Sequence, residues 1–91
     1  MKTIHKYPLA VVDSQHVLLP LGAEILSAQF QGIQLCLWAL VDTDQPLRAR
    51  SIVLLETGNA IPPVLADNLS KKNFIGTVQE PNYPMVWHIF A

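Results

Sequence analysis

Arg48 and Arg50 form the pair of side chains in this sequence best suited to bind a ligand. One residue separates them at the beginning of an apolar segment, so in a strand both would point to the same face. Guanidinium groups donate paired hydrogen bonds to phosphate or carboxylate, and aromatic rings nearby can stack on a base. We expect these rings from Trp38, Trp87 and Tyr83. The alternative interpretation places both tryptophans in the core and both arginines in salt bridges at a solvated rim or an interface.

A second candidate for ligand contact is the segment Thr57, Gly58 and Asn59. Glycine tolerates a positive φ and has no side chain, so the backbone N–H groups of such a turn can approach a bound anion. We therefore include these three residues in the expected ligand-binding set.

Residues that commonly catalyse reactions are present but form no catalytic motif. His5, His16 and His88 lie on three different expected strands, and no pair has the i, i+4 spacing of a helical zinc motif. Cys36 lies between two leucines and is expected to be a small core residue rather than a nucleophile. No serine lies in a nucleophile elbow, and there is no glycine-rich phosphate loop. We expect no catalytic residue, no metal site and no cofactor.

The composition of the chain describes one small domain, residues 1–91. Hydrophobic residues make up 51% of the chain, charged residues 14%, and the net charge is -1. A nearly neutral chain lacks the clustered cations that bind DNA or RNA. One cysteine excludes an internal disulfide, and no apolar stretch is long enough for a signal sequence or a membrane helix. We expect a soluble protein of the reducing cytoplasm, without a membrane partner.

The low charge also predicts self-association. A domain of this size hides only about 60% of the surface that its unfolded chain exposes. Hydrophobic area is therefore expected to remain outside the core, and large apolar patches usually mark an interface. We expect a homo-oligomer with closed symmetry. The alternative is a monomer whose polar surface is rich in glutamine and proline.

Seven prolines and four glycines divide the chain into short segments, which favours strands over helices. The pattern predicts strands at residues 3–7, 16–19, 23–30, 33–41, 51–57, 74–79 and 85–90. The strand at 33–41 is apolar on both faces and is expected at the centre of the fold, after a turn at residues 31–32. Residues 42–50 are expected to form a polar loop, and residues 64–69 one short helical turn. The expected fold is all-β, with six to seven short antiparallel strands in a small barrel or sandwich.

Several groups of residues form a pattern that extends over nearly the whole chain. They are Lys6-Tyr7-Pro8-Leu9, Leu19-Pro20 with Gly22-Ala23 and Ile25-Leu26, Leu37-Trp38-Ala39-Leu40-Val41-Asp42, Thr57-Gly58, Ile75-Gly76-Thr77 with Gln79, and Val86-Trp87-His88-Ile89-Phe90. This pattern resembles an uncharacterised family of small bacteriophage and prophage proteins. The resemblance implies a genomic setting but no assigned activity. Where relatives have Gly-Thr-Gly-His, this chain has Glu56-Thr57-Gly58-Asn59, so no histidine chemistry is carried over to that segment.

Together, the residues and the resemblance lead to one expected function and two alternatives. We expect a non-enzymatic accessory protein of phage type that inhibits a host defence by binding. In its sharper form, the oligomer sequesters a nucleotide immune signal at subunit junctions, with Arg48 and Arg50 holding the phosphates. One alternative is a protein–protein module with a flat apolar patch that blocks a host enzyme or joins a phage assembly. The other is a small nucleotide hydrolase, which requires a histidine cluster that the sequence does not show.

Overall fold

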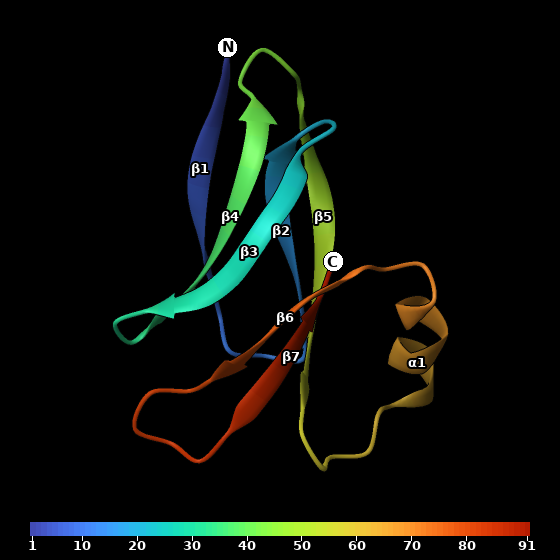
Figure 1. Ribbon diagram of the computed structural model, residues 1–91. Coiled ribbons are helices and arrows are strands. Elements are labelled where there is room, and N and C mark those ends of the chain that lie inside the picture. Colours follow the sequence, from blue (N-terminus) through green and yellow to red (C-terminus); the bar gives the residue numbers. More distant parts are fainter.

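Seven strands and one short helix make up the computed structural model, which describes residues 1–91 (Figure 1). The strands are β1 (Lys2–Leu9), β2 (Ser14–Pro20), β3 (Glu24–Gln31), β4 (Gln34–Asp42), β5 (Leu47–Glu56), β6 (Phe74–Gln79) and β7 (Val86–Phe90). The helix α1 (Pro63–Leu69) lies between β5 and β6 in the chain. The structure confirms the expected all-β fold and its number of strands.

The strands form two antiparallel sheets that face each other. The first sheet has the order β1-β4-β3 and the second the order β2-β5-β7-β6. At one side of the molecule β3 and β6 lie next to each other but are not paired in a ladder. The architecture is therefore a sandwich and not a closed barrel.

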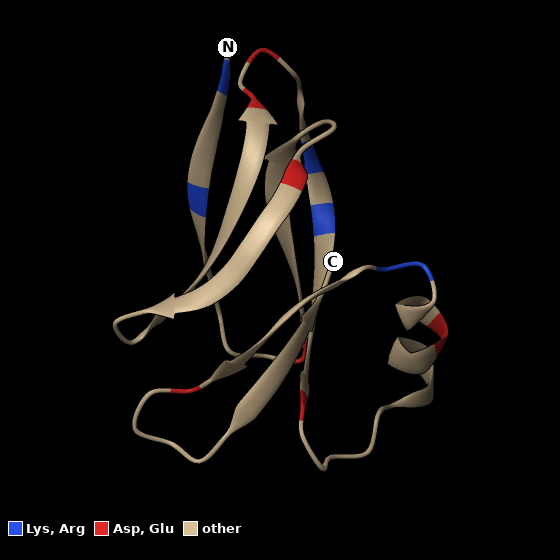
Figure 2. Ribbon diagram, in the orientation of Figure 1, with Lys and Arg blue, Asp and Glu red and all other residues tan.

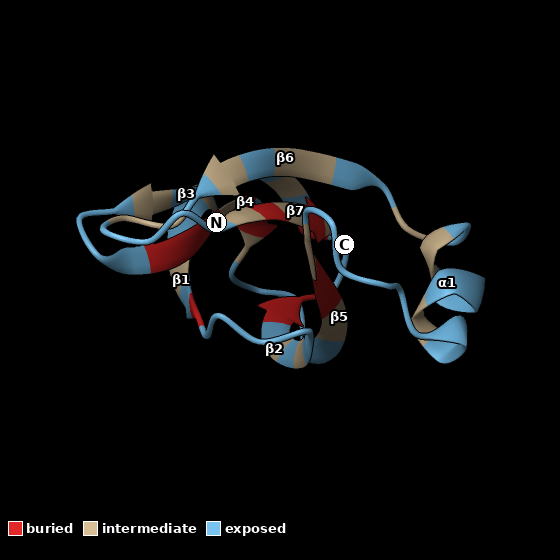
Figure 3. Cartoon of the chain, turned by 90° about the horizontal axis from the view of Figure 1, so that it is seen from below, coloured by how far each residue is buried: buried red, intermediate tan, exposed pale blue.

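Strand β4 shows how the sequence builds the core between the sheets. Its residues Leu35, Leu37, Ala39 and Val41 alternate along the strand, point to the second sheet and are at most 2% exposed. Burial of an aliphatic side chain of this size stabilises a fold by about 1.5–3 kcal/mol. Figure 3 shows buried residues on β2, β4, β5 and β7, which belong to both sheets. Cys36, on the other side of β4, is also buried, as the sequence predicts.

Three sequence-based boundaries are wrong, because pairing with a neighbouring strand decides where each strand ends. Strand β5 begins at Leu47, inside the expected loop at residues 42–50, since residues 47–50 pair with β2. Strand β1 continues through Pro8, which is tolerated because one side of an edge strand has no ladder partner. The β3–β4 turn lies at Gly32 and Ile33 rather than at residues 31–32, and Ile33 is 83% exposed.

The helix α1 occupies the place of the expected helical turn at residues 64–69. It begins with Pro63, and proline is favoured in the first helical turn. None of its seven residues is buried and no side chain caps its N-terminus. A helix this short is marginal in water. We conclude that α1 connects β5 to β6 and contributes little to the core.

Candidate anion-binding groove

Arg48 and Arg50 lie on the side of β5 that faces the first sheet. Alternation places them in line with the buried residues Ile52 and Leu54, so the arginines continue this face beyond the end of the core. Arg48 is exposed and Arg50 is half-buried. Arg50 donates a hydrogen bond of 3.1 Å from Nη1 to the carbonyl oxygen of Ala23. A guanidinium group has five N–H donors, so Arg50 retains others for a ligand.

Two adjoining hollows surround Arg50 at this end of the sandwich. The smaller hollow has a volume of about 120 Å³ and is lined by Arg48, Arg50 and the turn between β2 and β3. The larger hollow, of about 460 Å³, extends from the same turn to the beginning of β6. Because both hollows share Gly22, Ala23 and Arg50, they form one open groove. We call it the arginine groove and define it by Gly22, Ala23, Glu24, Arg48, Arg50, Asn73 and Phe74.

The turn between β2 and β3 shapes one wall of the arginine groove. Gly22 has a φ of 81°, a conformation that glycine adopts without strain. The turn closes with a hydrogen bond of 3.1 Å from the N–H of Ala23 to the carbonyl oxygen of Pro20. This conformation leaves the carbonyl oxygen of Ala23 to accept from Arg50, which orients the guanidinium group.

Lys72 adds a third cation beside this groove, on the segment between α1 and β6 (Figure 2). Its Nζ donates a hydrogen bond of 2.9 Å to the carbonyl oxygen of Ser51. Burial and the nearby charge of Arg50 lower the pKa of Lys72 below its usual value of 10.5. No carboxylate lies within ion-pair distance of these cations, because the ion pairs of the chain join only the N-terminal ammonium to Asp42 and Asp44. The groove therefore holds Arg48 and Arg50, with Lys72 beside it, against the single carboxylate of Glu24, and this excess of positive charge favours an anion.

Phe74 gives the arginine groove an aromatic surface. Its side chain is 59% exposed, and its ring packs edge-on against Phe90 with 5.6 Å between centroids. Neither Phe74 nor Lys72 is among the site residues expected from the sequence. A cation, an amide and an aromatic ring follow one another at residues 72–74, just before a strand, and this succession is the sequence signal that could have indicated a binding site. Only the fold shows that this segment lies beside Arg50.

The aromatic residues named from the sequence lie elsewhere in the chain. Trp87 is 7% exposed in the core and donates from Nε1 to Glu80 Oε1 at 3.2 Å, which confirms its interpretation as a core anchor. Trp38 is half-buried on the side of β4 that points away from the second sheet. Tyr83 is exposed in the β6–β7 loop and lines a different hollow with Phe30. Within one chain, none of the three lines the arginine groove.

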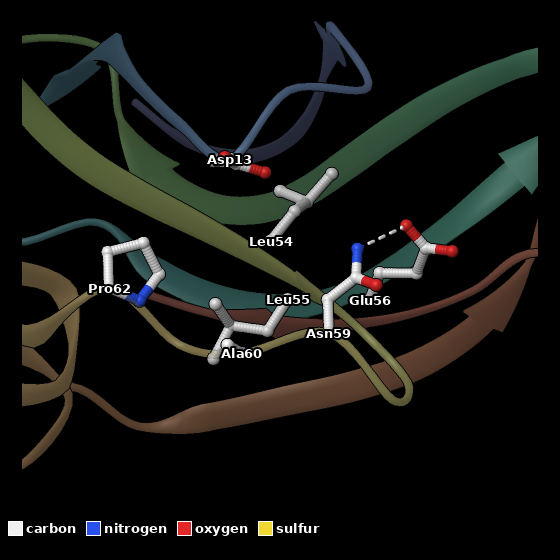
Figure 4. A pocket seen from close by; sticks show the side chains of 7 residues that line it. All are labelled: Asp13, Leu54, Leu55, Glu56, Asn59, Ala60 and Pro62. Atoms are coloured by element: carbon white, nitrogen blue, oxygen red, sulfur yellow. Dashed lines mark hydrogen bonds between the residues drawn. The ribbon is translucent and has the colours of Figure 1, made fainter.

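Thr57, Gly58 and Asn59 follow β5 at the end opposite to the arginines. Asn59 Nδ2 donates a hydrogen bond of 2.9 Å to Glu56 Oε2 (Figure 4). Asp13 lines the same hollow, whose volume is about 80 Å³. Two carboxylates and a volume this small do not suit a phosphate, since like charges repel. We therefore leave this turn out of the anion site.

His88 forms a polar network that the sequence analysis did not identify. Its Nε2 lies 2.7 Å from Thr57 Oγ1 and its Nδ1 lies 2.9 Å from Thr77 Oγ1. One nitrogen of a neutral imidazole donates and the other accepts, so the two hydroxyl groups satisfy both. No carboxylate hydrogen-bonds to the ring, and none of the hollows includes these residues. We interpret the network as a set of hydrogen bonds that joins β7, β6 and the turn after β5.

Comparison with protein-family models assigns this chain to a family. The model described as domain of unknown function DUF7352 matches residues 1–91. The chain belongs to this family. No match was found among curated proteins or among solved structures. Because the description of the DUF7352 family carries no activity, the function has to be argued from the arginine groove.

One further finding concerns the helical content of this DUF7352 member. Its single helix, α1, has seven residues, and no helix is long and apolar enough to cross a membrane.

Proposed function

We propose that this protein binds a small phosphate-bearing ligand, a nucleotide, in the arginine groove and does not transform it. The observation that carries the proposal is the convergence of Arg48, Arg50 and Lys72 without a carboxylate in ion-pair distance. Cations held together in this way repel each other, and a bound anion relieves the repulsion. Phosphate oxygens also match the fork of donors that a guanidinium group presents.

The other residues of the arginine groove favour a nucleotide over inorganic phosphate. The exposed ring of Phe74 offers a surface for a base, and stacking of this kind contributes about 1–3 kcal/mol. Asn73 and Glu24 bring an amide and a carboxylate that can bond to the polar groups of a base or a ribose. The volume of about 460 Å³ lies within the usual range for small-molecule sites.

The lining of the arginine groove supports binding without catalysis. It contains no histidine, cysteine or serine that could act as a nucleophile or a general base, and its one carboxylate is Glu24. The polar network around His88 includes no groove residue. A ligand held in the groove is therefore expected to leave it unchanged.

We extend the proposal to a biological setting. The resemblance of several motifs, among them residues 37–42 and strand β7, to small bacteriophage proteins supports an accessory protein that a phage would produce in the bacterial cytoplasm. A protein that binds a nucleotide and leaves it intact would inhibit a host defence by sequestering its nucleotide signal. Assembly into a homo-oligomer would increase the number of sites in each particle.

The test is calorimetric titration of the protein with ADP, with cyclic di-AMP and with inorganic phosphate. We expect at least one nucleotide to bind more tightly than phosphate, and Arg48→Ala with Arg50→Ala to weaken its binding by at least 100-fold. This loss follows from two charge-assisted hydrogen bonds of about 1.5–3 kcal/mol each. Lys6→Ala is the control, because it removes a cation from β1 that lines neither hollow of the groove. The control is expected to bind like the wild-type protein.

Two results would contradict the proposed function. In the first, neither nucleotide binds and native mass spectrometry of protein purified gently from bacteria shows no small-molecule adduct. In the second, a nucleotide binds equally well to the double arginine variant, which would place its site elsewhere. A host protein that co-purifies while nucleotides fail to bind would instead favour a protein–protein module.

A further inference from the structure

The outer face of the first sheet is apolar at its centre and polar toward its edges. On β4 this face is formed by Cys36, Trp38, Leu40 and Asp42, whose carboxylate pairs with the N-terminal ammonium, and on β1 Ile4 is in register with Leu40. Ile4 is 56% exposed and Leu40 is 36% exposed. The helix α1 lies on the side of the molecule away from β1, so it does not cover this face (Figure 1). We name it the β1–β4–β3 face and define it by Lys2, Ile4, Lys6, Pro8, Glu24, Ser27, Gln29, Cys36, Trp38, Leu40 and Asp42.

Charged residues of opposite sign stand on the two outer strands of this face. Strand β1 contributes Lys2 and Lys6, and strand β3 contributes Glu24. Neither Lys6 nor Glu24 has an ion-pair partner within the chain. Lys6 donates from Nζ to the neutral amide oxygen of Gln31 at 2.6 Å, a bond that reaches across β4. The face therefore combines an apolar centre with one positive and one negative side.

We propose that this face binds a second copy of the same chain, independently of the proposed nucleotide binding. Two identical faces pack against each other through a twofold axis that lies between them. If the axis runs along the strands, β1 of each copy lies over β3 of its partner. Glu24 and Ile4 both pair with Leu40, so the partner's Glu24 lies opposite Ile4, with Lys2 two residues along β1 on one side and Lys6 two residues along on the other. If the axis runs across the strands, β1 lies over β1 and the lysines repel each other. The charges thus select the axis along the strands.

This arrangement places β4 near the axis, where Trp38 packs close to the partner's Trp38. Tryptophan at the centre of an interface commonly contributes much of the binding energy. Lys6 exchanges its bond to a neutral amide for one to a carboxylate, and the charge-assisted bond is the stronger. Three strands of about eight residues cover roughly 400 Å² on each copy. Since stable complexes bury about 1,200 Å² or more in total, we expect a weak dimer that forms at micromolar concentrations or above.

Sedimentation equilibrium between about 5 μM and 1 mM, a range set by the expected weak affinity, tests the dimer and its axis together. The samples are the wild-type protein, Lys6→Glu, Glu24→Lys and the double reversal, each checked for folding by circular dichroism. We expect each single reversal to raise the dimer Kd at least tenfold and the double reversal to restore it to within about threefold, since each reversal turns an attraction into a repulsion. Lys71→Glu is the matched control, because this exposed lysine lies between α1 and β6, away from the face.

Each contrary outcome overturns the proposal. A wild-type protein that is monomeric at every concentration excludes the dimer. Association that neither single reversal weakens places the interface on another surface. A double reversal as weak as the single ones shows that Lys6 and the partner's Glu24 do not meet. Ile4→Lys provides a second probe, because it introduces a charge in the apolar centre at an already exposed position and should also prevent dimerisation.

Discussion

Lys72 is the residue whose ionisation depends most directly on the proposed site. Burial first and the charge of Arg50 second lower its pKa below 10.5 in the folded chain. Between the lowered pKa and 10.5 the unfolded chain binds more protons than the folded one, so this residue makes the free energy of unfolding rise with pH in that window. Below the lowered pKa the cost of the charged ammonium is fully present. An anion in the arginine groove would offset this cost.

We predict that Arg50→Ala raises the pKa of Lys72 toward 10.5, because it removes the neighbouring positive charge. Addition of ADP to the wild-type protein is expected to raise the same pKa, since the ligand brings negative charge. NMR titration of the Lys72 side-chain resonances measures both effects. Arg48→Ala serves as the control, and we expect it to leave the pKa of Lys72 unchanged. If the pKa of Lys72 does not change in Arg50→Ala, burial alone lowers it and the charge of Arg50 has no effect.

Among the strands and the helix, β4 and α1 differ widely in how far their residues are buried. Strand β4 lies between β1 and β3, and its inward residues are fully buried. The helix α1 buries none of its residues. The free energy of unfolding therefore depends on the inward side of β4, while its outward side is available for association.

Substitutions on the two sides of β4 are expected to differ in cost. Leu37 is 0% exposed and Leu40 is 36% exposed. We predict that Leu37→Ala lowers the free energy of unfolding by about 2–5 kcal/mol, the range for a leucine deleted from a packed core. Leu40→Ala is the matched control, with an expected cost of about 1 kcal/mol or less, because its side chain already contacts water. Urea unfolding at a protein concentration low enough to avoid dimerisation gives both values, and equal costs would contradict this account of the sandwich.

The whole molecule is thin, and this shape bears on both the proposed nucleotide binding and the proposed dimer. The chain measures 41 × 32 × 16 Å and buries only 16 of its 91 residues. A sandwich of this thickness leaves many apolar side chains on its surface, and in a small domain they cannot all enter one core. The arginine groove opens at one end between the sheets, whereas the β1–β4–β3 face covers the outside of the first sheet. The two surfaces share Glu24, but Lys6 belongs only to the face and Arg48 and Arg50 only to the groove, so substitutions of these three residues separate them.

We predict that Lys6→Glu, which should prevent dimerisation, binds ADP or cyclic di-AMP with a Kd within about twofold of the wild-type value, since residues that share no partner act independently. Lys6 does not line the groove. Calorimetry on the monomeric variant provides the measurement. Loss of nucleotide binding together with loss of the dimer would instead mean that the nucleotide site is completed by the partner, at a subunit junction.

Much of the fold could be predicted from local patterns in the sequence. Alternation along residues 33–41, a glycine at the β3–β4 turn and frequent prolines are local signals, and they correctly indicated an all-β fold with a buried Cys36. The short helix before β6 followed from the same kind of signal. Each of these features depends on residues a few positions apart, which is why the sequence determines them.

Only the tertiary structure decided which residues share a site. Pairing with β2 extended β5 into an expected loop, and the return of the chain through α1 placed Lys72 and Phe74 beside Arg50. The layering of the sheets buried Trp87 and left Trp38 on an outer face. These outcomes depend on contacts between segments that are distant in the chain. Local periodicity carries no information about such contacts, so the sequence predicted the two arginines but not their neighbours.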